Sequence, residues 1–203
     1  STSADAGDLA SIHALTALTV ALDKVTTITG DFSELQTYIT DEDQYTLKNN
    51  VTTIQLSNQQ IDGVLANNIQ RGTVAQLVTF LSDITDTSDG HNANANVDFS
   101  NVTLISGGYS DINTVRTSSV VTTNSLNNVN YTVTGGAISI ANANILSAAT
   151  GGVVTATIAN STIAQILHAQ NGLAADGGNN AYTIDISSTS ADAGDLASIH
   201  ALT

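Results

Sequence analysis

The sequence predicts an α/β or β-rich solenoid, in which parallel strands alternate with short helices in stacked coils. Three observations support this. The same sixteen residues open and close the chain, Thr-rich β-branched stretches alternate with short segments of helical spacing, and the apolar residues are mostly aliphatic, with three Phe, five Tyr and no Trp. Stacked thin layers can be filled by aliphatic side chains, each layer covering the apolar face of the next. We therefore expect coils of about 20 to 30 residues with an aliphatic core.

The duplicated ends are the most specific feature of the chain. Residues 1–16 and 188–203 both read STSADAGDLASIHALT, at an offset of 187 residues (188 − 1). We expect 1–187 to be one full tandem repeat and 188–203 to be the start of the next identical repeat, inside a longer polypeptide that extends beyond both ends. An artificially duplicated end is the alternative.

A weaker repetition divides this period. Tyr-Thr-aliphatic triplets begin at Tyr45, Tyr131 and Tyr182, with gaps of 86 (131 − 45) and 51 (182 − 131) residues. The next Tyr45 would follow Tyr182 by 50 residues (45 + 187 − 182). The long gap has room for a diverged unit. We therefore expect sub-units that start near Tyr45, Asn96, Tyr131 and Tyr182.

Short helices are predicted where a polar or glycine residue leads into apolar residues at helical spacing. Ser, Thr, Asp and Asn side chains accept hydrogen bonds from the free N–H groups of a first helical turn. The segments with this pattern are 5–12, 30–35, 72–77 and 161–166, with looser relatives at 57–61 and 141–145.

Strands are predicted between these segments. Residues 25–29, 51–56 and 153–158 place aliphatic side chains on one face and Thr on the other. Glycines such as Gly30 and the pair Gly151-Gly152 mark the corners. The polar stretch 85–96 interrupts the pattern and is expected to be a surface loop.

Charge and composition exclude several classes of function. The formal net charge is −14, and the four basic residues (Lys24, Lys48, Arg71, Arg116) are scattered. Nucleic-acid binding needs clustered Lys and Arg, so we expect no nucleic-acid partner. We also expect no membrane insertion, because no apolar run approaches about 18 residues. Without cysteine there are no disulfides, thiolate metal sites or cysteine nucleophiles.

The acidic residues are the candidate metal ligands. Asp41, Glu42 and Asp43 form a tight cluster before an expected strand, and Asp83, Asp86 and Asp89 lie in or near the expected loop. Carboxylates and backbone carbonyls are the ligands that Ca²⁺ prefers, so calcium is the one candidate cofactor; solvated turns are the alternative. The histidines show no metal-ligand spacing, and His13 and His200 are the same repeat position. No cofactor is required by this reading, and no catalytic residues are assigned.

Thr-rich strands, phrases such as Gly72-Thr73-Val74-Ala75-Gln76-Leu77, and Tyr182-Thr183-Ile184 ahead of Asp-rich helix starts resemble the tandem repeats of giant secreted bacterial surface proteins. These include cyanobacterial-type repeats, adhesins exported by type I secretion and surface-layer-like proteins. The resemblance implies an extracellular or cell-surface location and a structural or adhesive role. Many relatives carry calcium nonapeptides, whose repeated aspartate is missing here from 175–180.

The function expected from these observations is structural. Copies would assemble end to end into a fibre, sheath or cell-surface layer, with neighbouring copies as partners and no enzymatic activity. The first alternative is an adhesin or ligand-binding module for carbohydrate or ice. The second is a carbohydrate-active enzyme, which would need a cleft lined by Asp and Arg116.

Overall fold

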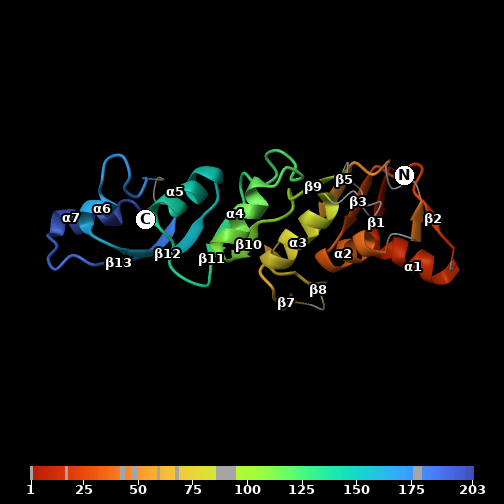
Figure 1. Cartoon of the computed structure of the whole chain (residues 1–203), viewed down its shortest axis with the longest axis horizontal. Helices are drawn as coiled ribbons and strands as arrows, with labels where there is room; N and C mark the ends of the chain where they lie inside the picture. Colours follow the sequence, from red (N-terminus) through yellow and green to blue (C-terminus); the bar gives the residue numbers. More distant parts are fainter. Residues whose placement is uncertain are drawn as a thin grey trace.

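The computed structural model describes residues 2–16, 18–41, 44–46, 50–58, 60–66, 69–85, 95–175 and 180–203. Figure 1 shows an elongated molecule in which the elements follow one another along the long axis nearly in sequence order. The first elements, β1 (Ser3–Asp5) and α1 (Ala6–Thr16), lie at one end, and β13 (Ala181–Ile186) and α7 (Ala193–His200) lie at the other.

The first sheet lies in the N-terminal half of the molecule. Its order is β1-β3-β5-β9, and every pairing in it is parallel. The added strands are β3 (Thr27–Gly30), β5 (Thr53–Leu56) and β9 (Asn96–Asp98). Beside this sheet, β2 (Val20–Ala21) pairs with β4 (Tyr45–Thr46), and β7 (Leu65–Ala66) forms an antiparallel hairpin with β8 (Ile69–Gln70).

The second sheet lies in the C-terminal half and has the order β13-β12-β11-β10-β6. All its pairings are parallel, and its remaining strands are β6 (Gln60–Ile61), β10 (Leu104–Gly107), β11 (Asn130–Val133) and β12 (Val154–Ser161). In β12 the side chains of Val154, Ala156 and Ile158 are buried, whereas Thr155 and Thr157 are exposed. The strands predicted at 25–29, 51–56 and 153–158 correspond to β3, β5 and β12.

Helices follow most of the strands and pack in a row. The remaining ones are α2 (Phe32–Thr40), α3 (Val74–Thr85), α4 (Tyr109–Thr117), α5 (Ile140–Ala149) and α6 (Ile163–Ile166). α1 contacts α2, α2 contacts α3, and α3 contacts α4. Each of these first four helices thereby contacts at least one of its neighbours in the chain.

Several helices begin where the sequence predicts, because their first turns are capped. At α2 the Asp31 carboxylate accepts a hydrogen bond from the Glu34 nitrogen at 2.9 Å, and the Glu34 carboxylate accepts one from the Asp31 nitrogen at 2.8 Å. Such a reciprocal pair satisfies two free N–H groups of the first turn. Thr and Gln make the same exchange at α3 and α6.

The helix start predicted at 57–61 is wrong, because this segment leads into β6 instead. The Asn58 side chain does not cap a helix of its own. Its oxygen accepts a hydrogen bond from the backbone nitrogen of Phe32, at the start of α2.

The solenoid prediction is also wrong. The described residues form an α/β fold with two large parallel sheets, two two-stranded sheets and seven helices, and the arrangement is neither closed nor solenoid-like. Thr27 pairs with Thr53, 26 residues later (53 − 27), but Thr53 pairs with Asn96, 43 residues later (96 − 53). The hairpin β7–β8 and helix α3 fill this longer connection. The longer strands lie in two sheets instead of one regular stack.

The prediction of an aliphatic core is wrong in one respect, because the core also contains aromatic side chains. All three phenylalanines (Phe32, Phe80, Phe99) and the tyrosines Tyr38 and Tyr131 are fully buried beside the aliphatic residues. Phe32 and Phe80 join α2 to α3 by an edge-to-face contact, with ring centroids 5.7 Å apart.

The four expected sub-unit starts all fall in strands. Tyr45 opens β4, Asn96 opens β9, Tyr131 lies in β11 and Tyr182 lies in β13. The division of the chain into repeats stays a prediction, because a common place in a strand does not establish a common origin.

Candidate functional site

The acidic clusters proposed as calcium ligands are only partly described. Asp41 directly follows α2 and is half-buried, and Asp83 lies half-buried in the last turn of α3. Glu42, Asp43, Asp86 and Asp89 lie outside the described residues. Among the residues that are described, no group of three His, Asp or Glu side chains is placed to hold a metal ion. Calcium binding at the six acidic residues stays a prediction.

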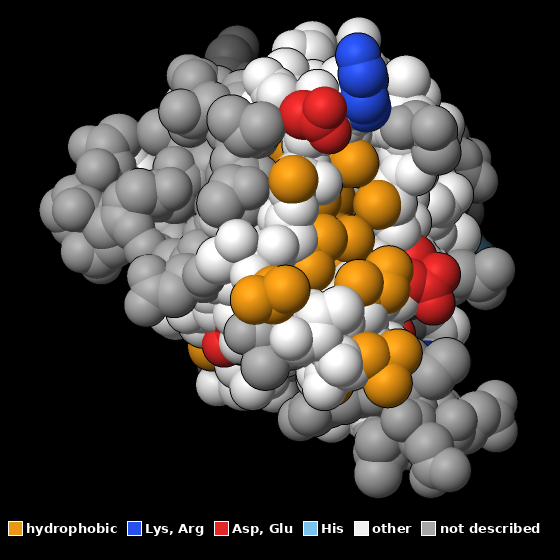
Figure 2. All heavy atoms as spheres, turned by 90° about the vertical axis from the view of Figure 1, so that its right-hand side faces the viewer, with side chains coloured by type: hydrophobic (Ala, Val, Ile, Leu, Met, Phe, Trp, Pro, Cys, Tyr) orange, Lys and Arg blue, Asp and Glu red, His pale blue; other side chains and the backbone are white. Residues whose placement is uncertain are grey.

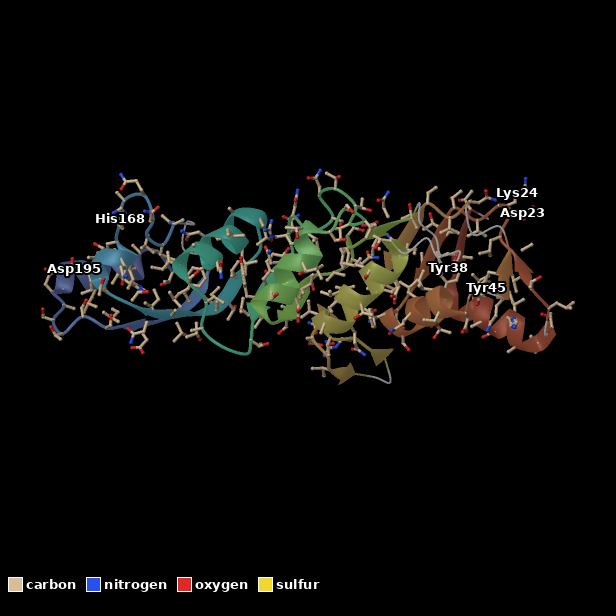
Figure 3. All side chains as sticks on the ribbon, viewed as in Figure 1. Asp23, Lys24, Tyr38, Tyr45, His168 and Asp195 are labelled. Atoms are coloured by element: carbon tan, nitrogen blue, oxygen red, sulfur yellow. The ribbon has the colours of Figure 1, made fainter. Side chains whose placement is uncertain are left out.

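A cleft lies between α5, β12 and α6. It has a volume of about 520 Å³ and is lined mainly by small side chains, among them Ala141, Ala159 and Ala164, with His168 at its border. The Nδ1 atom of His168 accepts hydrogen bonds from the backbone nitrogens of Gln170 and Asn171, both at 3.3 Å. This histidine thereby shapes the turn after α6 (Figure 3). Among the described residues, no Asp, Glu, Lys or Arg side chain lines this cleft, and Arg116 lies elsewhere, on α4.

Two tyrosine hydroxyls are buried without a hydrogen-bond partner among the described residues, on Tyr45 and Tyr131. Burial raises the pKa of Tyr131 to about 12, and the nearby positive charge of Arg116 opposes this rise. Burial also raises the pKa of Tyr45, with a smaller contribution in the same direction from Asp41. Tyr45 lies against Tyr38 with ring centroids 5.1 Å apart (Figure 3), so both tyrosines serve the packing of this end of the molecule.

The end of the molecule formed by α1 exposes an apolar face. Ile12, Leu15 and Leu18 are exposed there. Figure 2, which looks at this end, shows hydrophobic side chains in a band across it, with few charged side chains at its edges. A contiguous apolar surface of this kind marks an interaction site more often than a scattering of single residues does.

The two sheets also end in open strand edges. β1 pairs only with β3, and β13 pairs only with β12, among the described residues. The outer N–H and C=O groups of an edge strand form a template for pairing with another chain. β13 carries an exposed Asp185 between the half-buried side chains of Ile184 and Ile186. The molecule therefore has an apolar face and a sheet edge at one end, and a second edge at the other.

Asparagine and serine side chains connect successive segments of the chain. The Asn180 side-chain oxygen accepts from the Val154 nitrogen at 2.8 Å, and the Ser188 hydroxyl accepts from the Ile163 nitrogen at 3.0 Å. The Asn144 side chain bonds the Gly172 oxygen and the Ala174 nitrogen. The abundance of Asn was the available indication, but which backbone group each side chain reaches depends on the strand pairing.

The described residues contain no helix with both the length and the apolar character needed to cross a bilayer. Comparison of the chain with protein-family models, with curated proteins and with solved structures gives no match, so its function has to be argued from its own residues.

Proposed function

We propose that this chain is a structural repeat of an extracellular fibre, sheath or cell-surface layer whose copies join end to end. The observation that carries the proposal is the identity of residues 1–16 with 188–203, at a fixed offset of 187 residues (188 − 1). A polypeptide that continues this period would present the same joining segment at the start of every copy. The role is mechanical, and the proposal assigns no catalytic chemistry to the chain.

The ends of the molecule support the proposal. The apolar side chains of Ile12, Leu15 and Leu18 face outward at one end, and β1 and β13 are edge strands at opposite ends. Surfaces that differ between the two ends give a head-to-tail contact, and such a contact extends into a filament when it does not close into a ring. The net charge of −14 favours solubility of the lateral surface.

A ligand-binding or adhesive module is the second candidate. The observation that favours it is the cleft of about 520 Å³ beside His168, whose volume lies in the range of small-molecule sites. In that case binding would be lost when the cleft is filled, for example by Ala164→Phe, while assembly of copies would be unaffected.

Electron microscopy of the native assembly, beside a sample treated with a calcium chelator, tests the structural role. We expect filaments or sheets with a regular axial repeat. Separate globular particles in both samples would contradict the structural proposal and favour the binding module. Loosening of the filaments by chelation would assign calcium to the acidic clusters, and filaments unchanged by chelation would assign those clusters to solvated turns.

A further inference from the structure

The same sixteen residues occur twice in this molecule, in two different environments. In the first copy Ala6 is 1% exposed and Leu9 is 6% exposed. Their counterparts in the second copy, Ala193 and Leu196, lie on the surface, and Leu196 is 46% exposed. Identical side chains are therefore buried at one end of the chain and uncovered at the other.

The opposite holds for the second half of the segment. Ile12 is 47% exposed and Leu15 is 86% exposed in the first copy. In the second copy Ile199, the counterpart of Ile12, is 6% exposed and belongs to the core, and Leu202, the counterpart of Leu15, packs against that core. Ala6 and Leu15 are nine positions apart, which places them on opposite sides of an α-helix at about 3.6 residues per turn.

The two copies differ because different segments of the same chain lie beside them. The first copy is followed by β3 and α2, so β1 pairs with β3 and α1 packs on both elements. The second copy is preceded by β12, α6 and β13, and its first residue, Ser188, accepts a hydrogen bond from the Ile163 nitrogen at the start of α6. Each copy therefore has the contacts that the other copy lacks.

We infer that the sixteen-residue segment is a two-sided joint between consecutive repeats. Its Ile12 and Leu15 side packs on the end of the preceding repeat, as Ile199 and Leu202 do here. Its Ala6 and Leu9 side is covered by the start of the following repeat, as in the first copy. The occupant of the exposed face on α1 is thus a second copy of the repeat, and the inference rests on the proposed tandem structural function.

The backbone makes the same distinction as the side chains. Ser3 to Asp5 form β1 and pair with Thr27 to Thr29. Their counterparts, residues 190–192, are not in a strand. In a joint between two repeats, residues 190–192 pair with the next copy of β3, which connects the second sheet of one repeat to the first sheet of the next.

Cysteine labelling tests this inference, because the chain has no cysteine of its own. The test uses a chain of two consecutive repeats, residues 1–187 followed directly by 1–203, beside the 203-residue chain. In the 203-residue chain a single cysteine replaces Ile12 or Leu196, both of which are exposed. In the two-repeat chain it replaces the equivalent of one of these residues in the central joint, which is the copy of the sixteen-residue segment where the two repeats meet. We expect maleimide to label both sites of the central joint at least about tenfold more slowly than Ile12→Cys and Leu196→Cys in the 203-residue chain.

Ile145→Cys is the matched control, because Ile145 is exposed on α5, outside the sixteen-residue segment, and its labelling rate should be equal in both chains. Amide hydrogen exchange gives a second measurement that needs no substitution. Residues 190–192 should exchange fast in the 203-residue chain and be protected in the central joint. A central cysteine that labels as fast as in the 203-residue chain, or unprotected amides at 190–192 in the two-repeat chain, would overturn the inference.

The measurement separates this inference from the proposed function. The joint forms within one chain in dilute solution, where no filament is present. A protected joint without filaments in the native assembly would support the inference and contradict the fibre role. Filaments with an unprotected joint would contradict the inference alone.

Discussion

The side-chain oxygen of Asn58 lies 2.6 Å from the backbone nitrogen of Phe32 and accepts its hydrogen bond, although the two residues are 26 positions apart. Asn58 follows β5 and is buried, and Phe32 is the first residue of α2. One side chain thus connects the start of α2 to the end of β5, the strand that pairs with β3 just before that helix.

Replacing Asn58 with Ala should destabilise the protein by about 1 to 3 kcal/mol, because the Phe32 N–H would stay buried without an acceptor. Urea unfolding followed by circular dichroism measures the loss. Asn171→Ala is the control: Asn171 is exposed, and its substitution should change the free energy of unfolding by no more than about 0.5 kcal/mol. Equal losses in the two variants would contradict the role of Asn58.

Alanine substitutions at Gly72 and Gly135 distinguish two ways in which an added methyl group destabilises the protein, backbone strain and a steric clash. Both have a positive φ, of 65° and 84°. A Cβ atom at Gly72 would lie 2.6 Å from the Phe32 ring, whereas nothing lies within 4 Å at Gly135. We expect Gly135→Ala to cost about 1 kcal/mol, from backbone strain alone. Gly72→Ala should cost on the order of 3 kcal/mol, because the Phe32 ring is packed against Phe80. Thermal unfolding of the pair measures the difference, and similar melting temperatures would show that the ring moves aside freely.

The raised pKa of Tyr131 predicts that the folded protein loses stability in alkaline solution. Its pKa is about 12 in the folded chain, against 10.0 for an ordinary tyrosine. Between pH 10 and 12 the unfolded chain loses this proton first, so the folded chain holds more protons and stability falls as the pH rises. The stability is fully present below pH 10, and the loss by pH 12 is on the order of 2 to 3 kcal/mol.

Tyr131→Phe should remove this part of the pH dependence and have little effect at pH 7, because the hydroxyl has no hydrogen-bond partner among the described residues. Denaturant midpoints measured at pH 7, 10 and 11 for both proteins provide the test. A variant whose stability falls with pH as steeply as that of the unchanged protein would show that other groups cause the loss.

Local structure was predictable from the sequence where neighbouring residues determine it. The polar residue ahead of apolar residues at helical spacing places the starts of α2 and α6 correctly, because Asp31 and Thr162 find their partners within one turn. The alternation of aliphatic residues and Thr places β3, β5 and β12 for a similar reason.

Structure that depends on distant residues was not predictable. The helix start expected at 57–61 fails because the polar side chain of Asn58 has a better partner in Phe32, which local spacing does not reveal. The solenoid prediction fails because β5 pairs with β9 across a long connection that contains β6, the hairpin β7–β8 and α3, and local spacing does not reveal which distant strand β5 will pair with. The burial of Phe32, Phe80 and Phe99 together also needs the three-dimensional arrangement.

The candidate site was likewise predictable from the sequence only in part. The duplication of residues 1–16 is visible in the sequence and predicts that the ends matter. The sequence does not show that Leu9 and Leu196 differ in exposure, because identical residues carry identical propensities and only their neighbours distinguish them. The acidic residues suggested calcium by their chemistry, whereas a binding site also requires ligands that converge in space.

The parallel pairings of the two large sheets have a consequence for how the chain acquires its structure. Their paired residues are never far apart in sequence, from 23 positions (Tyr131 and Val154) to 44 (Gln60 and Leu104). No strand near the N-terminus has to wait for a strand near the C-terminus. Each pairing closes a loop of this limited length, so less loop-closure entropy is lost before it forms than if the two ends of the chain had to pair. A chain that emerges gradually, N-terminus first, can therefore acquire its strands in order, each one completed by the next segment to appear.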